Sequence, residues 1–193
     1  AAAALLPRSD VVIEDVGLNP TRTQFLATLR SLGLAFEVTS EREKCNEPIG
    51  TLRVTGATQT AAEARPVIVG GAAIAQLIDE LPLLAVVGSQ TDGGIEIREA
   101  SELRLKESDR ISATVKNLRA MGAMVEETAD GMLVGGPTQL HGAVIDSYGD
   151  HRIAMAFSVA ALLASGESEI EGAECVSVSF PEFFNLLESI VER

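Results

Sequence analysis

Cysteine and histidine are scarce in this chain of 193 residues, which contains two of each. Cys45 and Cys175 lie far apart in the sequence, and His141 and His151 do not complete a metal-binding spacing with them. We therefore expect neither a disulfide framework nor a bound metal. The sequence also lacks a recognisable Ser-His-Asp or Cys-His arrangement, so nucleophilic catalysis of that kind is not indicated.

Positive charge and long apolar segments are also in short supply. The chain has 15 Lys and Arg against 28 Asp and Glu, which gives a net charge of −13 and a pI of about 4.5. This acidity argues against nucleic acids and anionic membranes as partners. The longest apolar stretches, residues 67–78 and 153–164, are too short to cross a bilayer. We expect a cytoplasmic protein without a membrane anchor.

What is present is typical of a globular protein, with 46% hydrophobic and 22% charged residues. Residues 13–33, 97–122 and 170–190 repeat one pattern, in which a short β-rich run leads into an amphipathic helix. The middle copy is longer than the others, and its additional residues fall at 102–107. Because an insertion in one copy of a repeat is often functional, we expect part of a site there.

The segments around these repeats predict an α/β domain. Alternating residues predict strands at 34–38 and 123–127 and a hairpin through 129–131, and nearly apolar helices are predicted at 75–87 and 150–164. The opening residues 1–6 are similar to the last turns of a helix that Pro7 stops, so we expect a fragment of a longer protein. We assign residues 1–193 to one domain with repeat units at about 1–66, 67–149 and 150–193.

Basic residues cluster in the middle of the sequence, where we expect them to face a cleft. Residues 102–111 are predicted to pass from a strand end into a helix start, with Ser108 or Asp109 as the N-cap. Lys106 and Arg110 beside a helix N-terminus suit a phosphate or carboxylate ligand. The alternative is a solvated helix start with local ion pairs. The cluster consists of Arg98, Arg104, Lys106, Arg110, Lys116 and Arg119.

Three other segments carry candidate residues. Asp150, His151 and Arg152 open the apolar helix at 150–164, where Asp150 is either a simple N-cap or part of an anion site. Asp79 interrupts the apolar segment 67–87 and is either a catalytic base or a helix cap. Residues 180–184, which contain three phenylalanines, predict a helix start with aromatic core contacts.

Over essentially the whole chain, these segments resemble the C-terminal half of the 5-enolpyruvylshikimate-3-phosphate synthase (3-phosphoshikimate 1-carboxyvinyltransferase) family. The order and spacing of the three middle motifs are highly specific. The motifs are GLNPTRT at 17–23, IDELP at 78–82, ELRLKESDR at 102–110, GDHRIAM at 149–155 and SFP at 179–181. The resemblance implies half of a two-domain inside-out α/β barrel, built from βαβαββ units with parallel helices inside and sheets outside.

The resemblance also implies a transferase of the shikimate pathway, which moves the enolpyruvyl group of phosphoenolpyruvate to the 5-hydroxyl of shikimate 3-phosphate and releases phosphate, without a metal or organic cofactor. Carried over by motif, Asp79 contacts the hydroxyl and takes its proton, and Lys106 lies near the same hydroxyl and the departing phosphate. Glu107 is similar to the carboxylate that moves the proton at C3. Arg110 and Arg152 are similar to the guanidinium pair that holds phosphoenolpyruvate.

Two departures from the family accompany the resemblance. Some members carry a lysine as a further phosphoenolpyruvate ligand where this chain has Val178. The N-terminal domain of the family, with its phosphate-binding residues, has no counterpart in these 193 residues, so we expect no synthase activity from them alone. Two alternatives stay open: an enzyme similar to UDP-N-acetylglucosamine enolpyruvyl transferase, and a non-catalytic module of the same fold.

Overall fold

In the computed structural model, which describes residues 2–56 and 65–191, the first part of the chain forms an antiparallel sheet beside two helices. Strand β3 lies between β1 and β2, and the two-residue turn at Cys45 and Asn46, with φ angles of 54° and 63°, joins β2 to β3. The strand predicted at 34–38 is confirmed as part of β2. The helix end predicted at residues 1–6 is confirmed as α1, although Ala1 lies outside the described residues. The elements are α1 (Ala2–Leu5), β1 (Asp10–Gly17), α2 (Gln24–Ser31), β2 (Phe36–Lys44) and β3 (Glu47–Thr55).

The second part of the chain forms a complete βαβαββ unit around a four-stranded sheet. Strands β4 and β5 are parallel, whereas β7 runs antiparallel to both β5 and β6. The predicted hairpin is confirmed, because Thr128 pairs with Gly131 at the end of β6 and β7. The elements are β4 (Val67–Val69), α3 (Ala72–Leu77), α4 (Leu81–Gly88), β5 (Ile95–Ile97), the 3-10 helix η1 (Ser101–Leu105), α5 (Arg110–Ala120), β6 (Val125–Thr128) and β7 (Gly131–Val134).

The single helix predicted at 75–87 is wrong, since the structure contains two helices there, α3 and α4. Pro82 lies in the first turn of α4. Proline has no N–H to donate to the carbonyl four residues earlier, and its ring collides with that carbonyl, so one continuous helix cannot form. The resulting turn at 78–80 places Asp79 at the junction of the two helices.

The additional residues of the middle repeat form a 3-10 helix and a loop, so the strand end predicted within 102–111 is wrong. The predicted order of a strand and then a helix is nevertheless confirmed in all three copies, as β1 and α2, β5 and α5, and β9 and α7. The last part of the chain consists of β8 (Val144–Asp146), α6 (His151–Leu163), β9 (Glu169–Glu171), the 3-10 helix η2 (Ala173–Val178) and α7 (Phe183–Ile190), with β8 and β9 parallel.

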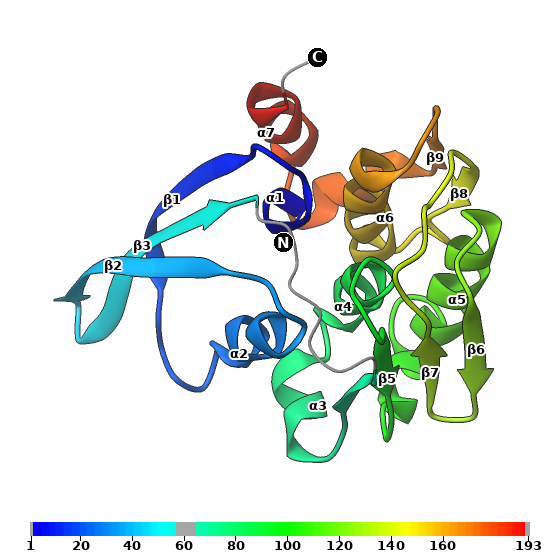
Figure 1. Ribbon diagram of the computed structural model, residues 1–193, viewed down its shortest axis with the longest axis horizontal. Coiled ribbons are helices and arrows are strands. Elements are labelled where there is room, and N and C mark those ends of the chain that lie inside the picture. Colours follow the sequence, from blue (N-terminus) through cyan, green and yellow to red (C-terminus); the bar gives the residue numbers. More distant parts are fainter. Residues whose placement is uncertain (1, 57–64, 192–193) are drawn as a thin grey trace.

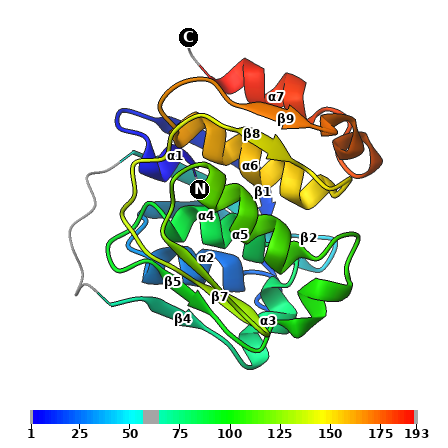
Figure 2. The same cartoon turned by 90° about the vertical axis from the view of Figure 1, so that its right-hand side faces the viewer.

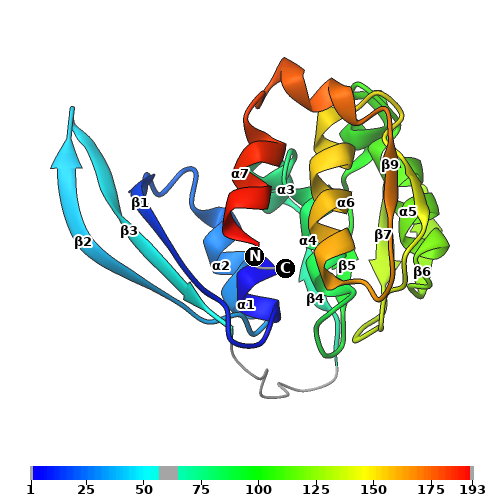
Figure 3. The ribbon, with the colours of Figure 1, turned by 90° about the horizontal axis from the view of Figure 1, so that it is seen from above.

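Sheets lie on two sides of the molecule, and several helices lie between them. The β1–β3–β2 sheet lies on one side, β7 and β9 lie on the other, and α1, α4 and α6 run between them (Figures 1 and 3). Every residue of α4 except Leu83 is buried, as its nearly apolar sequence predicts. The fold class expected from the sequence is therefore confirmed.

Helix α7 departs from the prediction of aromatic core contacts at 180–184. The helix begins at Phe183, but it has no buried residue, and the rings of Phe180, Phe183 and Phe184 pack on one another instead. Figure 2 shows α7 at the edge of the molecule, beyond α6. Among the residues that the structure describes, no helix combines the length and the apolar character needed to span a membrane.

Candidate functional site

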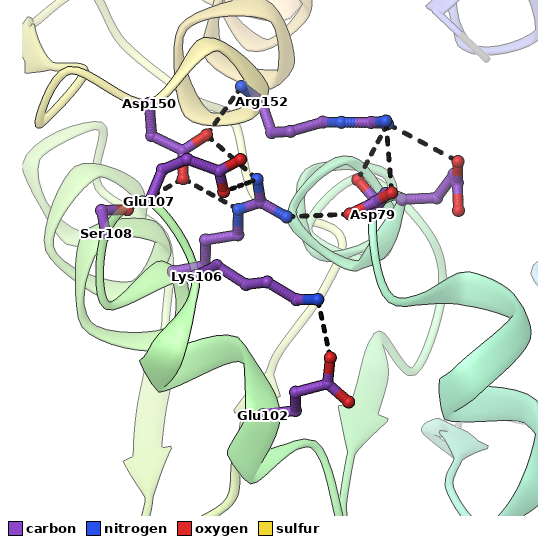
Figure 4. Close-up of polar contacts among 9 residues, drawn as sticks. Asp79, Glu102, Lys106, Glu107, Ser108, Asp150 and Arg152 are labelled. Carbon is purple, nitrogen blue, oxygen red and sulfur yellow. Dashed lines mark hydrogen bonds and ion pairs between the residues drawn. The ribbon is translucent and has the colours of Figure 1, made fainter.

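The candidate site lies where three helices begin. Helix α4 packs against α5 and α6, and side chains at the N-terminal ends of all three bond to one another. Because their N-termini meet, the positive ends of their dipoles converge at the site. Figure 4 shows these side chains, which come from the turn before α4, the loop before α5 and the start of α6.

Helix α5 begins at a side-chain cap. The carboxylate of Asp109 accepts a hydrogen bond of 3.0 Å from the backbone N–H of Ser112, which confirms Asp109 as the predicted N-cap. Arg104 donates to the same carboxylate at 2.7 Å. These bonds fix the loop that carries Lys106, Glu107 and Ser108 between η1 and α5.

Arg110 is the centre of the site, with only 1% of its side chain exposed. Its Nε donates to Asp150 at 2.8 Å, and its Nη1 donates to Asp79 at 3.0 Å. Its Nη2 donates to Glu107 at 2.6 Å (Figure 4). The alternative of a solvated helix start with local ion pairs holds only in part: Arg110 does pair with Glu107, three residues earlier, but Arg110 is buried, because carboxylates from three separate segments enclose its guanidinium.

Asp150 is the buried partner of Arg110 and is itself 0% exposed. It caps α6 by accepting the N–H of Arg152 at 2.8 Å, and it also accepts the hydroxyl of Ser108 at 3.1 Å. Burial alone raises the pKa of the Asp150 carboxyl, but the bonds from Arg110 and from the Arg152 amide outweigh it and hold that pKa below its usual value. The predicted cap is therefore confirmed, and the same carboxylate forms the buried ion pair with Arg110.

Asp79 bridges two arginines and does not cap a helix. One of its carboxylate oxygens accepts from Arg110, and the other accepts from Arg152 Nη2 at 3.3 Å. The N-cap position of α4 is occupied by Glu80, which makes no capping bond with its side chain. Glu80 Oε1 instead lies 3.6 Å from Arg152 Nη1.

Lys106 belongs to the same cluster at its edge. Its ammonium pairs with Glu102 Oε1 at 2.7 Å, four residues earlier (Figure 4). The whole cluster holds five carboxylates and three cations, so its own side chains carry more negative than positive charge. The carboxylates are Asp79, Glu80, Glu102, Glu107 and Asp150, and the cations are Lys106, Arg110 and Arg152.

The six clustered basic residues do not form one patch facing a cleft, so that prediction is wrong. Only Lys106 and Arg110 enter the site, and Arg152 joins them from α6. The other four are engaged elsewhere because strands and helix faces direct neighbouring residues to different sides. Arg98 pairs with Glu96, Arg104 with Asp109 and Glu127, Lys116 lies over the ring of Tyr148, and Arg119 donates to the Val125 carbonyl.

A pocket of about 240 Å³ adjoins the polar cluster. Asp79, Glu80 and Arg152 form its charged end, and the remaining lining is apolar and comes from α4, α6 and the region of Phe180 and Phe183. Val178, which stands where some family members have a lysine, is strongly exposed at the end of η2. Within residues 2–56 and 65–191, His, Cys, Asp and Glu side chains form no group of three or more placed to hold a metal ion.

Three contributors to the site were not predicted from the sequence, and one of them is Glu102, the partner of Lys106. Glu80 contacts Arg152, and the hydroxyl of Ser108 holds the carboxylate of Asp150. The presence of a second carboxylate directly after Asp79, in an otherwise apolar segment, could have drawn attention to Glu80. Ser108 was considered only as a cap of its own helix, and nothing in its local sequence indicates a contact with α6.

Comparison with known proteins gives consistent matches. The family described as EPSP synthase (3-phosphoshikimate 1-carboxyvinyltransferase) matches residues 1–187. A Koribacter versatilis protein named 3-phosphoshikimate 1-carboxyvinyltransferase is 50% identical over 192 residues, which is 100% of this chain and 44% of that protein. A Desulforamulus reducens protein of the same name is 47% identical and covers 98% of this chain and 43% of its own length. This chain therefore spans less than half the length of these relatives.

Solved structures agree with the sequence matches. The EPSP synthase of Acinetobacter baumannii has a TM-score of 0.88 and 35% identity, covering 98% of this chain and 43% of that chain. The enolpyruvyl transferase NikO from Streptomyces tendae has a TM-score of 0.76 at 20% identity, covering 98% of this chain and 40% of that one. The second likeness supports the fold alone.

Proposed function

The chain belongs to the EPSP synthase family, and from this premise we propose that, as part of a longer protein, it transfers the enolpyruvyl group of phosphoenolpyruvate to the 5-hydroxyl of shikimate 3-phosphate and releases phosphate. The observation that carries the proposal is the meeting of two arginines and two partly exposed carboxylates where three helices begin. The residues are Arg110, Arg152, Asp79 and Glu107.

Binding of phosphoenolpyruvate is assigned to Arg110 and Arg152. Guanidinium groups bind carboxylates and phosphates through paired hydrogen bonds, and the three helix dipoles add positive potential at the same place. In the chain as described, Asp79 and Glu107 occupy positions around Arg110 that an anionic substrate would take. Binding is therefore an exchange, in which the anion of the substrate replaces a carboxylate of the protein.

Proton transfer is assigned to the carboxylates that this exchange releases. Asp79 takes the proton of the 5-hydroxyl as that oxygen adds to C2 of phosphoenolpyruvate, while Glu107, in its protonated form, gives a proton to C3, and a tetrahedral intermediate forms. Glu107 then removes a proton from C3, the bond from C2 to the phosphate oxygen breaks, and the enolpyruvyl ether and phosphate are released. Lys106 neutralises the charge that develops on the departing phosphate. The side chains of Asp79 and Glu107 are partly exposed and so within reach of a substrate.

The charge of the site indicates that the activity requires the remainder of the longer protein. Five carboxylates against three cations repel two phosphorylated substrates, so further cations have to come from outside this chain. We assign these cations to the N-terminal domain that the family resemblance implies. We also propose a cytoplasmic location, because both substrates are charged metabolites that do not cross a membrane unaided.

The test uses this chain joined to the part of the Koribacter versatilis relative that it does not match, which we call the completed protein. We expect the completed protein to release phosphate from phosphoenolpyruvate only when shikimate 3-phosphate is present, and the chain alone to release none. Glu107→Gln in the completed protein should lower turnover by about 100-fold or more while phosphoenolpyruvate still binds.

A matched control is Glu126→Gln, which removes an exposed carboxylate on β6 and should leave turnover unchanged. Turnover by the chain alone would refute the need for a second domain. Phosphate release with UDP-N-acetylglucosamine in place of shikimate 3-phosphate would favour the related transferase, and a folded completed protein without turnover would favour a non-catalytic module.

A further inference from the structure

Both carboxylate oxygens of Asp79 are occupied in the structure, which creates a difficulty for its proposed role. One oxygen accepts from Arg110 at 3.0 Å and the other from Arg152 at 3.3 Å. A base that receives the proton of a substrate hydroxyl has to turn an oxygen toward that hydroxyl. Asp79 therefore has to release at least one of its two arginines during the reaction.

The two arginines differ in what remains once Asp79 turns away. Arg110 is buried and keeps its ion pair with Asp150 at 2.8 Å. Arg152 is about one-third exposed. Without the Asp79 carboxylate it keeps a hydrogen bond of 3.4 Å to the Asp79 backbone carbonyl, and its other ion pair among the described residues is with Glu80 at 3.6 Å. The position of Arg110 thus does not depend on Asp79, whereas the position of Arg152 depends on Asp79 and Glu80 together.

Glu80 is well placed to hold Arg152. Its backbone is fixed by a hydrogen bond from its N–H to the Leu77 carbonyl at 2.8 Å and by one from the N–H of Leu84 to its own carbonyl at 2.9 Å. Its carboxylate makes no helix cap, so it is available for an ion pair. Burial raises the pKa of the Glu80 carboxyl, opposed by the charge of Arg152, which indicates that the pair is partly shielded from water.

We propose that Glu80 is a positioning residue, which keeps the guanidinium of Arg152 over the site when Asp79 turns to the substrate hydroxyl. The proposal rests on the proposed function, because it assigns to Arg152 the binding of phosphoenolpyruvate. Glu80 itself does not touch the substrate. Its carboxylate acts only through Arg152, so its removal affects phosphoenolpyruvate and leaves shikimate 3-phosphate unaffected.

The experiment measures steady-state kinetics of the completed protein with Glu80→Gln, which keeps the size of the side chain and removes its charge. We expect the KM for phosphoenolpyruvate to rise about tenfold, with kcat changed less than about twofold and the KM for shikimate 3-phosphate unchanged. In a background of Arg152→Gln, the same substitution should add less than about a twofold effect, because the group through which it acts is already gone. Glu126→Gln serves as the matched control.

The possible outcomes separate this inference from the proposed function. A fall in kcat with an unchanged KM for phosphoenolpyruvate would mean that Glu80 transfers a proton or only supports folding, and the inference would be wrong. Equal effects of Glu80→Gln in the presence and absence of Arg152 would also overturn it. Absence of turnover in the unmodified completed protein overturns the proposed function, and the inference with it.

Discussion

One position of the repeat has very different surroundings in its three copies. Leu29 in α2, Leu118 in α5 and Leu186 in α7 occupy corresponding places, yet their exposed fractions are 4%, 0% and 50%. The amphipathic pattern is similar in the three helices, but α5 lies against α4, α6 and two sheets, whereas α7 lies at the edge of the molecule (Figures 1 and 2). Burial is thus set by the neighbours that a helix finds and not by its own sequence alone.

The same contrast separates the two large sheets. In the four-stranded sheet, Ile95 and Met132 are fully buried, whereas the buried hydrophobic side chains of β3 in the other sheet, Ile49, Leu52 and Val54, remain 7% to 8% exposed. A cavity of about 330 Å³ also remains between the β1–β3–β2 sheet and α2. The functional side chains lie on the better-packed middle unit and on α6. A site that depends on distances of about 3 Å needs such rigid support.

The largest expected effect distinguishes the buried ion pair of the site from an exposed one. Arg110→Met leaves the fully buried carboxylate of Asp150 without its main partner, so the free energy of unfolding should fall by about 3 to 5 kcal/mol. Arg53→Met removes an equally well-formed pair with Asp10, but both of those side chains are half exposed, so the loss should be far smaller than for Arg110→Met. Urea unfolding of the two variants measures the difference, and similar losses would refute the contrast.

The next effect tests the repeat directly. Leu118→Ala should lower the free energy of unfolding by about 2 to 5 kcal/mol, because it leaves a cavity in a closely packed region. Leu186→Ala, at the corresponding place in α7, should cost less than about 0.5 kcal/mol, because that side chain is half exposed. Thermal unfolding of both variants checks the prediction. A large loss from Leu186→Ala would mean that α7 is covered in solution.

The smallest effect is a pH dependence. The pKa of Asp150 is lower in the folded chain than in the unfolded chain, so its stabilising contribution is complete above about pH 4 and is lost as the pH falls through the folded value. Glu80 acts in the opposite direction, since burial raises its pKa and protonation therefore favours the folded state. Between pH 5 and 2, we expect Asp150→Asn to flatten the fall in stability. Above about pH 4.5, where Glu80 titrates in the folded chain, Glu80→Gln should remove the small gain in stability that protonation of Glu80 gives as the pH falls. If the urea midpoints of the unmodified chain and of the two variants change with pH in the same way, this assignment is wrong.

Much of the fold could be predicted because local patterns decide it. Period-two alternation and turn residues indicate the strands β2 and β6 and the hairpin that joins β6 to β7. The break at residues 78–80 was missed because the apolar pattern continues through it, although Pro82 supplies the physical reason. The 3-10 helix η1 was also missed, because its sequence alternates between polar and apolar residues as a strand does. Contacts with the rest of the domain favour the 3-10 helix instead.

The site could be predicted only in part. Asp79, Glu107, Arg110 and Arg152 were identified from the motifs, and the structure brings them together. The pairing of Arg110 with Asp150, 40 residues away in the sequence, could not be predicted from local patterns. It depends on how α5 packs against α6, which is a property of the whole domain.

The central claim is that Arg110 and Arg152 form the anion-binding centre for phosphoenolpyruvate. The dissociation constant of phosphoenolpyruvate, measured by calorimetry on the completed protein with shikimate 3-phosphate bound, tests it most directly. Arg152→Gln is the suitable variant, because Arg152 is partly exposed and its loss leaves the buried pair of Arg110 and Asp150 intact. We predict binding weaker by about 100-fold at an unchanged unfolding temperature. An unchanged dissociation constant in the folded variant would contradict the account.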